Sequence, residues 1–167
     1  MRRYPFILLW LTIVAALTVS GCGNTAPKEA LQEQNLSRNY VCEHVKKKDV
    51  EAMMETTFSY AEVGKHDFPN TRYCLYGNGP VSDVHLYYFT EPGSYDSAPM
   101  YEQTEPISGL GFEAKKVFVP SSGDIVQILG RTDAGVLSMV FTNGIKDQGE
   151  IYHNAIGLLA KLVKVFP

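Results

Sequence analysis

The 167-residue sequence has no internal repeat, no low-complexity tract and little clustering of basic residues. A chain of this length without repeats is sized for a single domain. Phosphate binding needs clustered Lys and Arg, but the one basic run, Lys46–Lys48, is bounded by Glu43 and Asp49. The sequence therefore disfavours nucleic acid as a partner. The aromatic content of 11% excludes a disordered or collagen-like polymer.

Motifs of common catalytic sites are also missing. The sequence contains no G-x-S-x-G elbow and no Ser-x-x-Lys motif, which are the usual signatures of serine nucleophiles. The sequence has four histidines: His44, His66, His85 and His153. No two of them have the spacing of paired zinc ligands. We therefore predict no metal and no cofactor, and we expect His85, within a strand, to be a packing residue.

Only one long apolar run is present, Phe6–Val19. Arg2 and Arg3 precede this run, and the small residues Ser20 and Gly21 follow it, which is the layout of a secretory signal. The run has 14 residues, whereas a membrane-spanning helix needs about 20. Residues 1–21 are therefore predicted to be a signal peptide.

The end of this signal, Thr18-Val19-Ser20-Gly21-Cys22, resembles the bacterial lipobox. The resemblance implies that Cys22 becomes the first residue and carries a diacylglyceryl thioether. Two or more acyl chains hold a protein stably on a bilayer. We therefore expect a lipid-anchored protein on the exported side of the cell membrane or the outer membrane. Loss of Arg2 and Arg3 would change the net charge from −3 to −5.

The other two cysteines, Cys42 and Cys74, are an even pair in an exported and therefore oxidising setting. This arithmetic favours a disulfide, with two buried free thiols as the alternative. In the chain-entropy model, closing a loop across their 32-residue separation is worth about 3–4 kcal/mol.

Composition divides the rest of the chain into a tether and a domain. Residues 22–38 hold only Leu31 and Leu36 as sizeable apolar side chains and are predicted to be a linker. Residues 39–167 are predicted to form one domain.

Apolar periodicity predicts helices at both ends of this domain. Val41, Cys42 and Val45 share one helical face, and Asp49 has the character of an N-cap for a second short helix. Residues 150–165 form the clearest amphipathic helix, because Ala155, Leu158, Leu159 and Leu162 with Ile151 and Phe166 fall on one stripe.

Between the helices, alternation predicts a strand at Thr71–Tyr76, and β-propensity predicts strands at Asp83–Thr90, Asp124–Arg131 and Val136–Thr142. Residues Phe112–Val119 are compatible with helix or strand, and strand is favoured before the turn at Pro120–Gly123. The predicted class is therefore α+β, an antiparallel β-sheet meander packed by an N-terminal helix pair and a C-terminal helix.

A glycine motif, Gly109-Leu110-Gly111 followed by Ala114, formally matches the dinucleotide fingerprint G-x-G-x-x-A. That fingerprint requires a buried parallel strand before it and a helix after it. Thr104-Glu105-Pro106-Ile107 is no such strand, so the sequence favours a tight turn.

The segment Tyr87–Pro106 is the most informative stretch for binding, with four acidic and no basic residues. Tyrosine supplies rigid amphipathic contact area at interfaces. The hypothesis is a recognition loop for a polar or cationic envelope partner, whose candidate binding residues are Tyr87, Tyr95, Tyr101, Glu91 and Asp96. The alternative is a solvated acidic loop whose tyrosines fold back onto the sheet.

Carboxylates could also serve catalysis, since the same segment holds Glu91, Asp96, Glu102 and Glu105. A glycoside hydrolase places two carboxylates about 5–10 Å apart across a cleft. A small cell-wall or lipid-modifying hydrolase is therefore one alternative function, and an inhibitor or accessory subunit of an exported enzyme is another.

Taken together, the lipobox, Cys42 at a helix start, Cys74 two positions before Tyr76, the glycines at 109–111 and the final apolar helix resemble small actinobacterial envelope lipoproteins of unknown function. The resemblance implies a helix-plus-antiparallel-sheet architecture and assigns no catalytic residues. We therefore expect a non-enzymatic domain that binds a ligand or protein partner, through Tyr87–Pro106 or a groove between sheet and helix.

Overall fold

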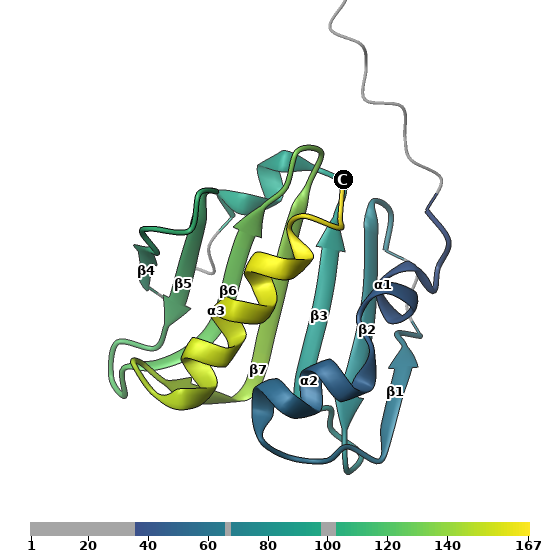
Figure 1. Ribbon diagram of the computed structural model, residues 1–167, viewed down its shortest axis with the longest axis horizontal. Helices are drawn as coiled ribbons and strands as arrows, with labels where there is room; N and C mark the ends of the chain where they lie inside the picture. Colours follow the sequence, from purple (N-terminus) through teal and green to yellow (C-terminus); the bar gives the residue numbers. More distant parts are fainter. Residues whose placement is uncertain (1–35, 66–67, 98–102) are drawn as a thin grey trace, which may run out of the picture. The chain divides into compact units, whose positions relative to one another are not determined.

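The central element of the fold is an antiparallel sheet (Figure 1). The computed structural model describes residues 36–65, 68–97 and 103–167, which belong to one compact unit, Glu33–Pro167. Within these residues seven strands pair in the order β1-β2-β3-β7-β6-β5-β4. They are β1 (Tyr60–Val63), β2 (Thr71–Gly77), β3 (Val84–Phe89), β4 (Gln103–Pro106), β5 (Ala114–Phe118), β6 (Asp124–Arg131) and β7 (Val136–Lys146). The predicted α+β class and antiparallel sheet are confirmed.

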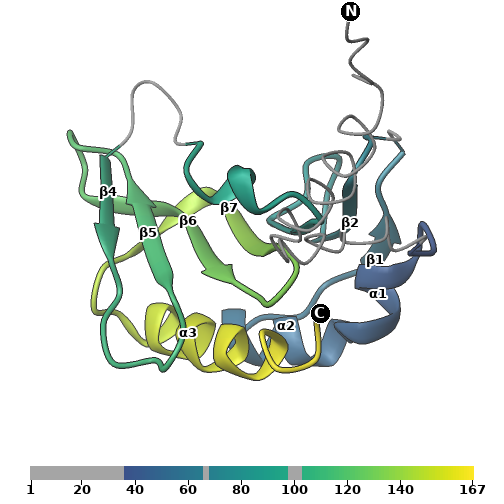
Figure 2. The same cartoon turned by 90° about the horizontal axis from the view of Figure 1, so that it is seen from above.

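Helices lie along one face of this sheet, the helix face, as Figure 2 shows. They are α1 (Tyr40–His44), α2 (Lys47–Met54) and α3 (Glu150–Leu162). A short 3-10 helix, η1 (Pro92–Tyr95), packs on the opposite face, which we name the η1 face.

The two faces follow from alternation along each strand. In β3, Val84, Leu86 and Tyr88 are fully buried in the core beneath the helices. Between them, His85 and Tyr87 point to the η1 face and are half-buried. The large core of the unit therefore lies between the sheet and the three helices.

The strand order differs from the uninterrupted meander that the sequence predicts. β3 pairs with β7, and the chain then reaches β4 at the far edge of the sheet. Four strand spacings are about 19 Å, which the residues between β3 and β4 can span because each covers up to about 3.3 Å. This long connection places η1 across the η1 face.

Two local predictions are corrected. α2 begins at Lys47 after Lys46, so Asp49 is not its N-cap but lies in its first turn, where a carboxylate still complements the helix dipole. The four-residue strands β1 and β4 were not expected from the sequence. Both lie at the edges of the sheet, where pairing with one neighbour suffices to define them.

The final helix agrees closely with its prediction. The buried stripe of α3 contains Ala155, Leu158, Leu159 and Leu162, but Tyr152 takes the buried place expected of Ile151. Gly130 of β6 lies directly beneath Leu159, since a Cβ there would come within 3.1 Å of both Leu159 methyl carbons. The glycine therefore lets the helix approach the sheet.

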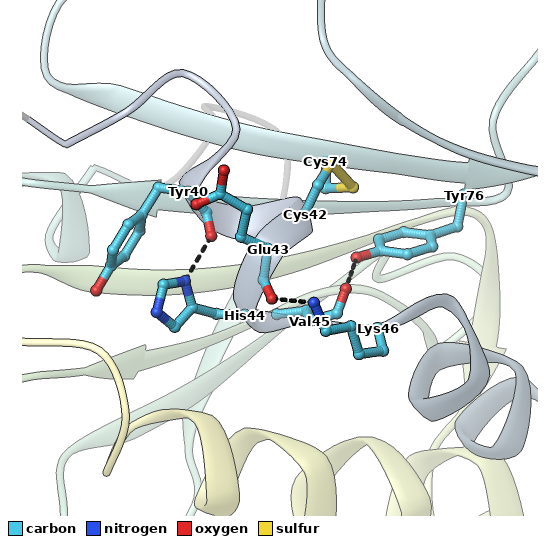
Figure 3. The surroundings of a disulfide bond; sticks show 8 residues. All are labelled: Tyr40, Cys42, Glu43, His44, Val45, Lys46, Cys74 and Tyr76. Carbon is cyan, nitrogen blue, oxygen red and sulfur yellow. Dashed lines mark hydrogen bonds between the residues drawn. A yellow bond between two sulfur atoms is a disulfide. The ribbon is translucent and has the colours of Figure 1, made fainter.

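A disulfide joins Cys42 of α1 to Cys74 of β2, with the two Cα atoms 5.2 Å apart (Figure 3). The predicted pairing is confirmed. Beside it, the Tyr76 hydroxyl donates to the carbonyl oxygen of Val45 at 2.8 Å, and burial raises the pKa of Tyr76. A covalent bond and a buried hydrogen bond thus attach α1 to the sheet.

Candidate functional site

The predicted lipidation site lies outside the described residues. Residues 1–35 include the predicted signal peptide, Cys22 and most of the predicted tether, so lipid anchoring stays a prediction. Among the helices that the structure describes, none combines the length and apolar character needed to cross a bilayer. Most of the described candidate residues lie on or beside the η1 face.

Three aromatic side chains form a stacked row on that face, which we name the aromatic row. Tyr73 and Tyr87 are cross-strand partners, with ring centroids 5.2 Å apart and planes inclined by 20°. Phe89 continues the row at 5.7 Å from Tyr87, with an interplanar angle of 12°. Such pairs stabilise by about 0.5–1.5 kcal/mol beyond the burial of their area. Burial raises the pKa of Tyr87.

A glycine next to β1 makes room for the aromatic row. A Cβ at Gly64 would lie 1.6 Å from the nearest ring atom of Tyr73. Any other residue at position 64 would force the Tyr73 ring to move. The sequence analysis missed this requirement, because Gly64 and Tyr73 meet only when β1 and β2 pair.

A half-buried histidine lies beside Tyr87, the central ring of the row. His85 Nδ1 lies 3.2 Å from the Tyr87 hydroxyl oxygen. Its other ring nitrogen, Nε2, is buried and has no hydrogen-bond partner among the described residues. Desolvation lowers the pKa of His85, so the ring is neutral at pH 7. The expectation of a packing residue fits this position.

Tyr95 anchors η1 to the η1 face. Its side chain is only 5% exposed and packs with Val117, Leu129 and Val136. Lys115 Nζ lies 4.6 Å from the Tyr95 ring centroid, and the Arg131 guanidinium carbon lies 4.5 Å from it. Cations at this distance interact favourably with the ring. We refer to Tyr95, Lys115 and Arg131 as the Tyr95 clamp.

The acidic candidates lie beside the clamp and are more exposed. Asp96 Oδ1 is 3.7 Å from an Arg131 guanidinium nitrogen, with 78% of the Asp96 side chain exposed. Glu91 accepts a hydrogen bond from the Asn70 side-chain amide at 2.5 Å. Tyr101 lies outside the described residues. The structure therefore brings Tyr95 and Asp96 together around Arg131.

Phe89 connects the aromatic row to the clamp. It packs against the same small apolar cluster that contains Tyr95, and it stacks on Tyr87. The predicted residues Tyr87 and Tyr95 are thus part of one continuous aromatic surface. The sequence analysis did not identify Tyr73, Lys115 or Arg131, which belong to other strands.

The described carboxylates of the 87–106 segment pair with other groups rather than with one another. Glu105 lies 3.2 Å from Lys116 Nζ, which also contacts Asp147 at 2.5 Å. Glu102 lies outside the described residues. Among the described carboxylates of this segment, Glu91 therefore contacts an amide, and Asp96 and Glu105 each contact a cation.

The other described histidines bond to their own helices. His44 Nδ1 lies 2.8 Å from the Tyr40 carbonyl oxygen, and His153 Nδ1 lies 2.8 Å from that of Gly149. His66 is outside the described residues. Within the described ranges, no three His, Cys, Asp or Glu side chains converge on a metal position.

The glycine motif forms a turn, as predicted. Gly109 and Gly111 have φ angles of +84° and +78° in the connection from β4 to β5. These left-handed conformations favour glycine. Because a strand and not a helix follows, no helix N-terminus is present there to receive a pyrophosphate.

Two hollows lie away from the η1 face. The smaller, about 270 Å³, lies between the end of α2, the β2–β3 turn and the end of β7, and its lining includes Phe58 and Asp83. The larger, about 380 Å³, lies between α2 and α3, and its lining includes Asp49 and His153. A groove between sheet and helix was one expected binding place, but the sequence indicated none of these lining residues, because segments distant in the chain form each lining.

Comparison of the chain with protein-family models, with curated proteins and with solved structures gives no match.

Proposed function

We propose that the chain is a bacterial lipoprotein, anchored through Cys22, whose domain binds a polar or cationic protein partner and catalyses no reaction. The observation that carries the binding role is the aromatic row of Tyr73, Tyr87 and Phe89. The row lies on the sheet face opposite the helices, because Tyr87 alternates in β3 with Leu86 and Tyr88 of the main core. Aromatic side chains of this kind are enriched at the centres of protein interfaces.

Charge near the row supports a cationic partner. Asp96 is 78% exposed, whereas Arg131, which faces it, is only 33% exposed. Glu91 is exposed as well. The carboxylates Asp96 and Glu91 are therefore more accessible than the Arg131 guanidinium, which favours approach of a positively charged surface.

Chemistry of the export route supports the location. The Cys42–Cys74 disulfide suits an oxidising compartment outside the cytoplasm. The lipobox at Thr18–Cys22 implies a lipid anchor on the same side of the membrane. The membrane holding the lipid would then present the domain to envelope partners.

Capture from envelope extracts tests the binding role. Full-length lipidated protein is immobilised, and its co-purifying proteins are compared with those of the Tyr87→Ala and Tyr60→Ala variants. Tyr60 is a half-buried tyrosine of β1 and serves as a matched control. We expect Tyr87→Ala to lose at least tenfold in captured partner and Tyr60→Ala to retain it. Equal capture by all three proteins, at equal melting temperature, would overturn the proposal.

Substitution of Cys22 tests the anchor separately. The Cys22→Ala variant is expected to leave the membrane pellet and to lose incorporation of labelled palmitate. An unchanged membrane fraction with unchanged labelling would contradict the lipobox assignment.

A further inference from the structure

The smaller hollow has the composition of a small-molecule site. It measures about 270 Å³ and opens where α2, the β2–β3 turn and β7 end. This volume is just below the range of about 300–1,000 Å³ typical of pockets for drug-sized ligands. It therefore suits a ligand of one ring. Tyr87 and Phe89 pair with the opposite half of β7, towards Val136, so this hollow is distant from the aromatic row along the strands.

Its floor is apolar and firmly held. Phe58 and Phe141 line it and are 4% and 2% exposed. The Phe58 backbone amide donates to Glu51 Oε1 at 2.8 Å, and its carbonyl accepts from Lys47 Nζ at 2.5 Å. The floor is thus fixed in place before any ligand arrives, which lowers the entropic cost of binding.

The rim is polar, and part of it is already committed to the fold. The Asn78 side chain donates to the Thr57 carbonyl at 2.7 Å and accepts from the Ser59 amide at 2.8 Å. The backbone N–H of Asn78 donates to Asp83 Oδ2 at 3.3 Å. Asn78 therefore shapes the rim and holds Asp83 in position.

Other polar groups of the rim are left for a ligand. Asp83 Oδ1 has no donor among the described residues, and neither Thr56 nor Asn143 makes a side-chain hydrogen bond to them. Together these side chains offer a carboxylate acceptor, a hydroxyl and a carboxamide. The lining contains one carboxylate and no cationic side chain.

We infer that this cavity binds one pyranose ring of a neutral or amino sugar. A pyranose has an apolar C–H face, which would pack on Phe58 and Phe141. Its hydroxyl groups both donate and accept, and would bond to Asp83, Thr56 and Asn143. Asp83 disfavours anionic sugars, because no cation of the lining offsets its charge. A free monosaccharide and the end of an envelope glycan both offer this ring, since the chemistry is the same.

Saturation-transfer NMR on the full-length lipidated protein in detergent tests the inference. The probes are N-acetylglucosamine, methyl β-glucopyranoside and glucuronic acid. We expect transfer to the first two and at least tenfold weaker binding of glucuronic acid. Asp83→Asn should weaken neutral-sugar binding about tenfold, the loss expected for one hydrogen bond to a charged group. Asp133→Asn makes the same change in an exposed turn and should leave binding unchanged.

Two filling variants keep the test decisive. Asn143→Trp and Thr56→Trp place a large side chain at exposed rim positions and should abolish transfer. Transfer that persists in both, or no transfer to either neutral sugar, would overturn the inference. Oligosaccharides ending in the same ring then separate the two sources. If they bind more tightly than the monosaccharide, the natural ligand is a glycan end. If they bind equally or more weakly, it is a free sugar. Partner capture should survive in the filling variants, so this site and the proposed partner face fail independently.

Discussion

The two faces of the sheet are held by different forces. On the helix face, aliphatic side chains such as Leu86 and Leu159 are fully buried, and a disulfide attaches α1. On the η1 face, stacked rings and a tyrosine between two cations accompany a smaller apolar cluster that contains Val117, Leu129 and Val136. Hydrophobic burial and cross-linking supply most of a domain's stability. The helix face therefore holds the larger part of the core, whereas Tyr87 and Phe89 of the η1 face remain partly exposed.

Removal of the disulfide should have the largest effect. The Cys42→Ala/Cys74→Ala variant is expected to lose about 3–4 kcal/mol in free energy of unfolding, because the unfolded chain regains the freedom of a 32-residue loop. Urea denaturation of the full chain measures the loss. A loss under about 1 kcal/mol would show that packing alone holds α1. Thiol titration of the denatured, unreduced wild-type chain should find no free thiol from either cysteine.

Loosening the Tyr95 clamp should have an intermediate effect. Tyr95→Leu removes the ring between Lys115 and Arg131 and is expected to cost about 1–2 kcal/mol. Tyr95→Phe keeps the ring and should cost less than about 0.5 kcal/mol. Urea midpoints compare the two variants. Equal losses for Leu and Phe would mean that the cations contribute nothing and that the η1 face is held by apolar packing alone.

The smallest effect should be a dependence on pH that is specific to the η1 face. Because burial lowers the pKa of His85, the unfolded chain binds a proton below about pH 6.5 that the folded chain does not. Stability from this group is therefore fully present above that pH and is lost as the pH falls towards the folded pKa. Urea midpoints are measured at pH 7, 6 and 5. As the pH is lowered, the midpoint should fall less in His85→Gln than in wild type. His153→Gln, at an exposed position of α3, should fall as wild type does; equal slopes in all three would contradict the assignment.

Sequence reasoning predicted the features that depend on local pattern. The β-forming residues of Asp83–Thr90 predicted the strand observed at Val84–Phe89, and apolar periodicity predicted the stripe of α3. The count of exported cysteines led to the Cys42–Cys74 pair. Each of these signals is contained in one segment or in composition, so no knowledge of the strand order was needed.

The features that were missed depend on which strands are neighbours. The segment sequence does not distinguish Tyr95 as an anchor, because its partners Lys115 and Arg131 come from β5 and β6. β1 and β4 are short, and β4 is exposed along its length, so neither shows alternating burial. The sugar-sized cavity combines Phe58, Asp83 and Phe141 from three separate segments. Tertiary pairing, which a single sequence does not show, created all of these.

The disulfide also has a mechanical consequence for a tethered protein. If tension from the membrane enters at Cys22, the covalent path runs through Cys42 directly into β2 at Cys74. The 31 residues between the two cysteines lie off that path and cannot be drawn out. At about 3.3–3.6 Å per residue, this withholds roughly 110 Å of extension from the loaded chain. The bridge therefore limits extension, and pulling on the anchor loads β2 before it can unravel α2 or the part of α1 that follows Cys42.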